Sequence, residues 1–139
     1  LKLDLPGTKI VIGDGPDLDK LRQAYPDVVF TGYRFGEELA RYLAAADVFV
    51  FPSLTDTYGL VMLEAMACGL PIAAFPVTGP IDVVDNGVTG VLDGDLQRAA
   101  LAALEINPQN CIDHARARSW RQCAEQFARY LQPCNQLTD

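Results

Sequence analysis

Short apolar segments rich in β-branched and aromatic residues alternate with helix-period segments along most of this 139-residue chain. The apolar segments lie at residues 10–12, 28–30, 48–51, 72–75 and 90–92. They lack the polar alternation of half-exposed strands, which is typical of strands covered on both faces. Strands that alternate with helices predict βαβ units. The sequence therefore predicts an α/β fold in which a parallel β-sheet is flanked by helices.

Helical periodicity fills the intervals between these segments. Apolar spacing predicts two early helix faces, one from Leu18, Leu21 and Tyr25 and one from Leu39, Tyr42, Leu43 and Ala46. Ser119 and Gln122 have the spacing of a capping box and predict the start of a closing helix. That helix carries an apolar stripe of Trp120, Cys123, Ala124, Phe127 and Leu131. Packing on the domain and a role in an interface both remain open for it.

Length and charge narrow the class of protein. A chain of this size buries a core without a disulfide or metal, so we expect one domain over residues 1–132 and a frayed tail over 133–139. The formal net charge of −7 argues against a nucleic-acid or anionic-membrane surface, although a local basic pocket remains open. Neither a membrane-spanning apolar run nor a basic leader is visible, which predicts a cytoplasmic protein.

The cysteines and the single histidine offer no metal site. The four cysteines have neither CxxC spacing nor a paired histidine, and we expect reduced structural thiols at Cys68, Cys111, Cys123 and Cys134. We expect His114 to be a solvated helix residue. No metal or cofactor is therefore predicted.

Ligands of open α/β sheets bind beyond the carboxyl ends of the strands, where this chain has loops rich in Gly and Pro. After the first apolar segment, Gly13 and Gly15 suggest a dinucleotide turn, but position 18 is Leu where the fingerprint needs a third glycine. A tight turn is the simpler interpretation, and it still allows backbone contact between Gly13 and a ligand. The chain has no P-loop pattern.

Glu64 is the strongest local anomaly, because it lies in the otherwise apolar segment 60–68. A helix that is apolar on all sides is expected to be buried, so this carboxylate needs a hydrogen-bond partner, an ion pair with an arginine such as Arg34, or a cleft. Asp56 and Gly59 lie near the start of the same helix, where free N–H groups can bind an anion. A helix cap is the alternative role for Asp56.

The segment from Asp56 to Pro71 resembles the E-x7-E signature of retaining GT-B glycosyltransferases of family 4. Segments 11–16, 29–33, 45–53 and 86–90 are similar to that family in the same order, and the resemblance covers residues 9–131. It implies a Rossmann-like donor-binding domain, the C-terminal half of a GT-B fold. The parent enzyme would transfer a hexose, of mannose or glucose type, from GDP-mannose or a UDP-sugar with retention of configuration and without a required metal.

The resemblance also assigns residues. Glu64 matches the second Glu, which holds the ribose hydroxyls, and Asp56 stands in the place of the first Glu, which faces the donor sugar. The helix start would give backbone amides to the sugar and phosphates, and the loop of Tyr33 and Arg34 would line the base. The amide residues are Tyr58, Gly59, Leu60 and Val61. Residues 78–84 and the Ser119-Trp120 ending favour a mannosyltransferase-like member.

The family pattern also predicts what lies outside this sequence. The first βα unit, with the Arg and Lys that clamp the pyrophosphate, and the N-terminal acceptor domain are both expected in a longer parent enzyme. We expect the present chain alone to be inactive in transfer, and the parent to contact a membrane peripherally. Two alternatives remain: a Rossmann-like binding module without catalysis, and a glycosidase that uses Asp56 and Glu64 as its carboxylate pair.

Overall fold

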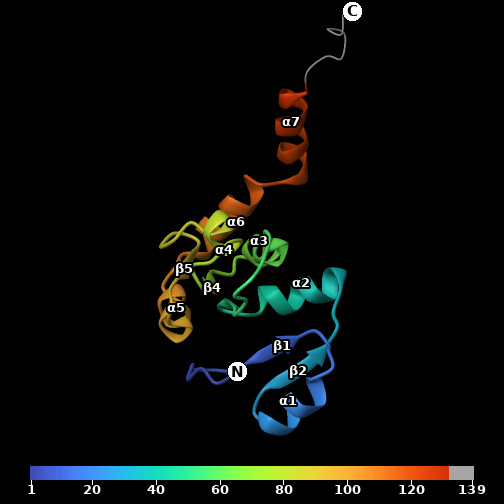
Figure 1. Ribbon diagram of the computed structural model, residues 1–139, viewed down its shortest axis with the longest axis vertical. Coiled ribbons are helices and arrows are strands. Elements are labelled where there is room, and N and C mark those ends of the chain that lie inside the picture. The colour runs from blue at the N-terminus through green and yellow to red at the C-terminus, as the bar shows by residue number, and fades with distance from the viewer. Residues whose placement is uncertain (132–139) are drawn as a thin grey trace, which may run out of the picture.

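The computed structural model describes residues 1–131 of the chain (Figure 1). The predicted frayed tail, residues 133–139, lies outside the described residues. Within residues 1–131, five strands and seven helices alternate along most of the chain, as the sequence predicted. They are β1 (Ile10–Ile12), α1 (Leu18–Ala24), β2 (Val29–Gly32), α2 (Gly36–Ala44), β3 (Phe49–Phe51), α3 (Leu60–Ala67), β4 (Ile72–Ala74), α4 (Pro80–Val83), β5 (Gly90–Leu92), α5 (Leu96–Ala103), α6 (Pro108–Arg116) and α7 (Trp120–Tyr130).

All strand pairs are parallel, which confirms the α/β class. Hydrogen bonds divide the strands into a two-stranded sheet, β1-β2, and a three-stranded sheet in the order β3-β4-β5. The register aligns Phe49 with Ile72 and Ile72 with Gly90. Each connection between paired strands contains a helix, because parallel neighbours need a crossover.

The core forms on both faces of β4. Successive side chains of a strand point to opposite faces, and here Ile72 and Ala74 join one apolar cluster while Ala73 joins another. The first cluster lies between the sheet and helices α3 and α6, and it contains the fully buried Met62, Met66 and Cys111. The second consists of small side chains, Ala73, Ala99, Ala100 and Ala103, which let α5 lie close to the sheet.

The unit formed by β1, α1 and β2 contributes no side chain to the buried members of either cluster. Ile10 and Val29, which are paired in register, are both nearly half exposed. The prediction of strands covered on both faces is therefore confirmed for β4 but is wrong for β1 and β2. Figure 1 shows this unit, in blue, at one end of the molecule.

At the other end, α7 begins with the predicted capping box. Ser119 Oγ accepts a hydrogen bond from the Gln122 amide at 3.4 Å, and the Gln122 side chain accepts one from the Ser119 amide at 3.4 Å. Every residue from Arg116 to Leu131 is exposed, and Figure 1 shows α7, in red, extending away from the rest of the chain. Of the two roles left open for this helix, packing on the described domain is therefore excluded.

Two smaller expectations have different outcomes. Cys68, Cys111 and Cys123 are free thiols, and Cys134 lies outside the described residues. The expectation for His114 is wrong, because His114 is half-buried and its Nε2 atom lies 2.8 Å from the Val83 carbonyl oxygen at the end of α4. His114 lies on α6 and Val83 on α4, so a contact between residues remote in the chain supplied that partner. In residues 1–131, no helix has both the length and the apolar character needed to cross a membrane.

Candidate functional site

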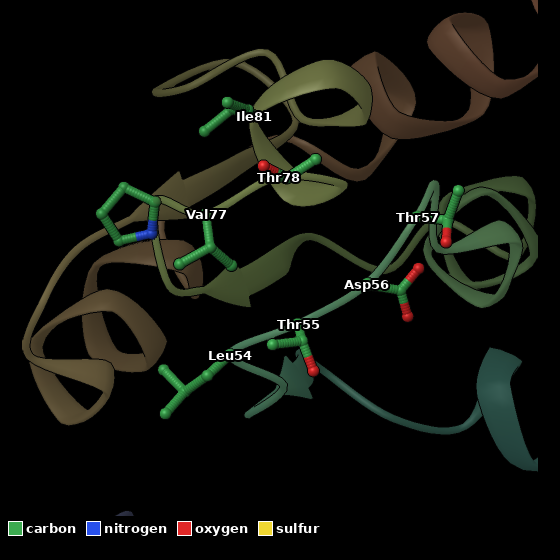
Figure 2. Close-up of a pocket in the computed structure, with 8 residues that line it drawn as sticks. Leu54, Thr55, Asp56, Thr57, Val77, Thr78 and Ile81 are labelled. Carbon is green, nitrogen blue, oxygen red and sulfur yellow. The ribbon is translucent and has the colours of Figure 1, made fainter.

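An open pocket of about 770 Å³ lies beyond the carboxyl ends of β3 and β4 (Figure 2). The loop after β3 provides one wall, and the loop after β4 with the first turn of α4 provides the other. The lining residues are Leu54, Thr55, Asp56, Thr57, Pro76, Val77, Thr78 and Ile81. This is the edge at which open parallel sheets bind their ligands, and two of the Gly- and Pro-rich loops, those after β3 and β4, line the pocket there.

Asp56 is the only ionisable residue in the described lining of this pocket. Its side chain is half-buried, and its Oδ1 atom accepts a hydrogen bond from the Tyr58 amide at 3.0 Å. This contact two residues along the chain is an Asx turn, which bends the loop into the start of α3. The alternative role of Asp56 as the helix cap is not observed, because Gly59 occupies the N-cap position.

Gly59 and Gly79 allow the backbone to pass closely on both sides of Asp56. Gly59 has φ 74° and ψ 55°, a left-handed conformation that other residues adopt at a cost. Gly79 has φ 92°, and a Cβ atom added there would lie 3.1 Å from Asp56 Cβ. The amide of Gly79 also donates to Asp82 Oδ2 at 3.4 Å. The absence of a side chain at Gly79 thus brings the β4 loop against the β3 loop.

The pocket combines hydroxyl groups with a short apolar end. Figure 2 shows Leu54 and Val77 at one end and the Asp56 carboxylate with Thr57 at the other. Thr55, Thr57 and Thr78 add three hydroxyls to its walls, and no Lys or Arg is among the described lining residues. A polyhydroxyl compound with one apolar face suits such a lining, because hydroxyls both donate and accept hydrogen bonds.

Glu64 lies on α3 but not on the wall of this pocket. The expectation that α3 is buried on all sides is wrong: Met62, Ala65 and Met66 are buried, whereas Glu64 is exposed. Leu60 and Val61 flank it on the exposed face, at 49% and 45% exposure. Burial, followed by the charge of Glu64 one turn away, raises the pKa of Cys68 above its ordinary value. Glu64 is therefore a carboxylate on an apolar but accessible helix face.

Gly13 and Tyr33 lie at the carboxyl end of the other sheet. The Gly13 amide donates to the Gly32 carbonyl at 2.9 Å, so this turn joins the ends of β1 and β2. The Tyr33 hydroxyl donates to the Asp14 carbonyl oxygen at 3.4 Å. Its ring is 60% exposed and stacks on Phe35 with 5.8 Å between ring centroids. The two aromatic rings form an accessible flat surface beside the turn.

Arg34 lies in the loop before α2 and is held by side chains of that helix, not by Glu64. Its Nε atom lies 2.9 Å from Glu38 Oε1, and its guanidinium lies 5.7 Å from the centre of the Tyr42 ring. That Nε atom is buried, and within residues 1–131 it donates no hydrogen bond of suitable geometry, so its contact with Glu38 is an ion pair. The interpretation of Arg34 as an ion-pair partner of Glu64 is therefore wrong, because Arg34 pairs with Glu38 of α2.

The structure thus gathers only part of the predicted site. Asp56 lines the pocket, and the four residues of the helix start, 58–61, begin two positions after it in the chain. Gly13 follows β1, and Tyr33 and Arg34 follow β2, all outside the pocket wall. Thr55, Thr57 and Thr78 were not singled out by their sequence, although their position after two strands was a usable signal. No group of three or more metal-ligating side chains occurs in the described residues.

Residues 6–106 match the model of a protein family described as glycosyl transferases group 1. A GDP-mannose-dependent alpha-mannosyltransferase of Corynebacterium glutamicum is 41% identical over 83 residues, which are 60% of this chain and 20% of that protein. The sulfoquinovosyl transferase SQD2 of Arabidopsis thaliana is 46% identical over 102 residues, which are 67% of this chain and 20% of that protein. The chain thus spans about a fifth of the length of these relatives.

The fold of the chain is also similar to that of a solved structure. The Anabaena protein HepE, crystallised with UDP-glucose, superposes with a TM-score of 0.69 and 26% identity, covering 88% of this chain and 41% of that one. The parallel strands and flanking helices of the present chain therefore have a counterpart in a larger protein that binds a nucleotide sugar.

Proposed function

Because this chain belongs to the glycosyl transferases group 1 family, we propose that it is the donor-binding part of a retaining glycosyltransferase, which transfers a hexose from a nucleotide diphosphate sugar to an acceptor. The relatives named as a mannosyltransferase and a sulfoquinovosyl transferase support a sugar as the transferred group. The neighbour solved with UDP-glucose supports a nucleotide diphosphate as the carrier.

The observation that carries the proposal is the position of Asp56. Its carboxylate lines a pocket of hydroxyl groups and is also hydrogen-bonded to the amide of Tyr58, one residue before the helix start at Gly59. A donor sugar in the pocket would therefore lie beside Asp56, and its diphosphate would lie at the amino end of α3. Helix amino ends bind phosphates because free N–H groups and the helix dipole both attract negative charge.

Within this arrangement, the helix start supplies the phosphate contacts. We assign the backbone amides of Tyr58, Gly59, Leu60 and Val61 to the donor sugar and phosphates. A side chain at Gly59 would meet the buried Met62, so glycine keeps this turn in place, and the exposure of Leu60 and Val61 keeps this face open. Fixed amide dipoles stabilise the charge that grows on the leaving diphosphate, which is the main contribution expected in such a reaction.

The nucleoside would lie along the exposed face of α3. We assign Glu64 to the ribose hydroxyls, since its carboxylate is accessible and accepts hydrogen bonds. The aromatic surface of Tyr33 and Phe35, with Arg34 and the turn at Gly13, is assigned to the base. A base stacks favourably on an exposed aromatic ring.

We further propose that the 139 residues bind donor weakly and do not catalyse transfer by themselves. The pocket has no Lys or Arg among its described lining residues, so only the helix start compensates the diphosphate charge. The remaining cations and the acceptor site would come from the rest of a longer enzyme, and peripheral membrane contact is proposed for that enzyme. Sugar transfer by the 139-residue chain to any acceptor would contradict this part of the proposal.

The donor role is tested by amide NMR spectra of the chain during titration with GDP and with UDP into the millimolar range. We expect resonances of residues 58–61 and 76–78 to shift with at least one nucleotide. In Glu64→Ala the affinity should fall about tenfold, because hydrogen bonds to a charged group are lost. Glu105→Ala, which removes another exposed carboxylate outside the pocket wall, is the matched control. Equal affinities of Glu64→Ala and the unaltered chain would exclude the ribose role.

A further inference from the structure

His114 on α6 holds the end of α4, the helix that borders the pocket. Its Nε2 atom lies 2.8 Å from the carbonyl oxygen of Val83, the last residue of α4. A carbonyl oxygen only accepts hydrogen bonds, so Nε2 carries the proton and donates in this contact. The last carbonyl groups of a helix have no partner within it, and Val83 is only 1% exposed. The contact therefore pairs a buried acceptor that α4 leaves free.

Helix α4 is a single turn, and it connects this contact to the pocket. At its start, the N-cap residue Gly79 packs against Asp56, and Ile81 within the turn lines the pocket (Figure 2). At its end, His114 holds the last carbonyl group. One turn of helix is only about 5.4 Å long, so a shift at one end is passed to the other. The position of Gly79 thus depends on both ends of α4.

Helix α6 also supports the element behind the opposite wall of the pocket. Its Cys111 belongs to the same buried cluster as Met62 and Met66 of α3, the helix that follows the Asp56 loop. Cys111 and His114 are three positions apart and therefore lie on the same side of α6. Figure 1 shows α3, α4 and α6 close together. One side of α6 thus contacts the helices that follow both pocket walls.

Two neighbouring residues of α6 make similar contacts that end elsewhere. Asn110 Nδ2 donates to the Val88 carbonyl oxygen at 3.4 Å. Cys111 Sγ donates to the Thr89 carbonyl oxygen at 3.5 Å. Both carbonyl groups lie in the turn before β5, beyond the end of α4. Of these three donors, His114 is the one that reaches α4, so Asn110 offers a control that leaves α4 untouched.

We propose that His114 is a positioning residue for the donor pocket. By holding the end of α4, it keeps Gly79 against Asp56 and so fixes the separation of the two pocket walls. His114 does not line the pocket, so it acts through α4 and not by touching the donor. Its effect on a bound sugar rests on the donor role proposed above. Both partners of the contact belong to the described chain, so the contact is complete without the rest of a longer enzyme.

Two conservative substitutions separate this role from a general effect on stability. In His114→Gln the side-chain amide nitrogen falls near the place of Nε2 and can still donate, whereas in His114→Asn it falls one bond short. Without ligand, the amide NMR signals of residues 55–57, across the pocket, should shift in His114→Asn. They should stay in place in His114→Gln and in the control Asn110→Ala. Imidazole nitrogen NMR of the unaltered chain should show the Nε2-protonated tautomer.

Ligand titrations measure the consequence for the sugar. The chain and its variants would be titrated with UDP and UDP-glucose, and with GDP and GDP-mannose, at a temperature where urea unfolding shows every variant to be folded. In His114→Asn the affinity for the nucleotide sugar should fall about two- to fivefold, while the affinity for the nucleotide alone stays the same. His114→Gln and Asn110→Ala should bind the nucleotide sugar as the unaltered chain does. A loss of stability alone would not produce this selective effect.

Several outcomes would overturn the proposal. Unshifted signals of residues 55–57 in His114→Asn would leave His114 with a structural role only. Equal effects of His114→Gln and His114→Asn, or equal losses of affinity for nucleotide and nucleotide sugar, would have the same meaning. If the unaltered chain binds none of the four compounds, the donor role fails instead. The signals of residues 55–57 then still decide whether His114 positions the pocket wall, because they are recorded without ligand.

Discussion

Gly79 packs directly against Asp56, so that a Cβ atom on Gly79 would lie 3.1 Å from Asp56 Cβ and 3.2 Å from its carbonyl oxygen. The two residues follow different strands, β4 and β3, and this contact joins the two walls of the pocket. The pocket therefore keeps its width only as long as position 79 has no side chain.

Gly79→Ala is expected to destabilise the chain by about 1–3 kcal/mol, because alanine is strained at φ 92° and its methyl group meets the backbone of Asp56. The displaced loop should also weaken nucleotide binding. Urea unfolding measures the first effect and amide NMR titration measures the second. Gly94→Ala is the control, since a Cβ atom at Gly94 has open space. Equal unfolding midpoints for the two variants would contradict the importance of this contact.

Asp56→Asn separates the charge of Asp56 from its hydrogen bond. The asparagine Oδ1 atom can still accept from the Tyr58 amide, so the unfolding free energy should change by less than about 0.5 kcal/mol. If the carboxylate faces the donor sugar, the variant should discriminate less between UDP-glucose and UDP, while its affinity for UDP itself stays the same. Calorimetric titration with both compounds gives the comparison. Unaltered discrimination would argue against a sugar contact at Asp56.

The ion pair between Asp93 and Arg98 at the start of α5 should be visible in an acid titration. Arg98 Nε donates to Asp93 Oδ2 at 2.6 Å, and the Asp95 amide donates to Oδ1. These contacts lower the pKa of Asp93 to about 2, so their stabilisation is present above the ordinary carboxyl pKa and is lost as the pH falls through about 2. Arg98→Gln should raise this pKa towards its ordinary value. Carboxyl NMR titration tests this, with Arg41→Gln as the control.

The thiols should differ in reactivity towards iodoacetamide at mildly alkaline pH. Cys123 is exposed and should react first, whereas burial raises the pKa of Cys111 to about 11 and leaves it largely protonated. Cys68 should react more slowly than Cys123, because burial and then Glu64 raise its pKa. Glu64→Gln should accelerate Cys68 without changing Cys123. Mass spectrometry of the alkylated sites would expose a wrong order, such as Cys111 reacting before Cys123.

The strands were predictable because each is a short apolar run with glycine or proline close by. The first and last predicted segments, 10–12 and 90–92, have the bounds of β1 and β5. The capping box of Ser119 and Gln122 was equally local, since both partners lie within one turn. Such features depend only on residues that are close in the chain, so they can be predicted from the sequence.

The exposure of Glu64 was not predictable, because it depends on residues that are far away in the chain. Leu60 and Val61 are as apolar as the buried Met62 and Met66, so composition cannot tell which side of α3 is covered. Helix α6, which is remote in the chain, decides this by packing on α3. The partner of His114 and the contact between Gly79 and Asp56 are long-range in the same way, and no local pattern encodes them.

The division of the strands into two sheets has a consequence for how the chain opens. Backbone amides of β4 lie between two apolar clusters, and their exchange with solvent requires those clusters to come apart. The β1-α1-β2 unit has no share in either cluster, so it can unfold as a separate cooperative unit at lower free energy. The aromatic surface assigned to the base follows β2 directly, and its Tyr33 hydroxyl is hydrogen-bonded to Asp14 of that unit, whereas the pocket at Asp56 lies beyond β3 and β4. A bound nucleotide would bridge the two and couple their unfolding.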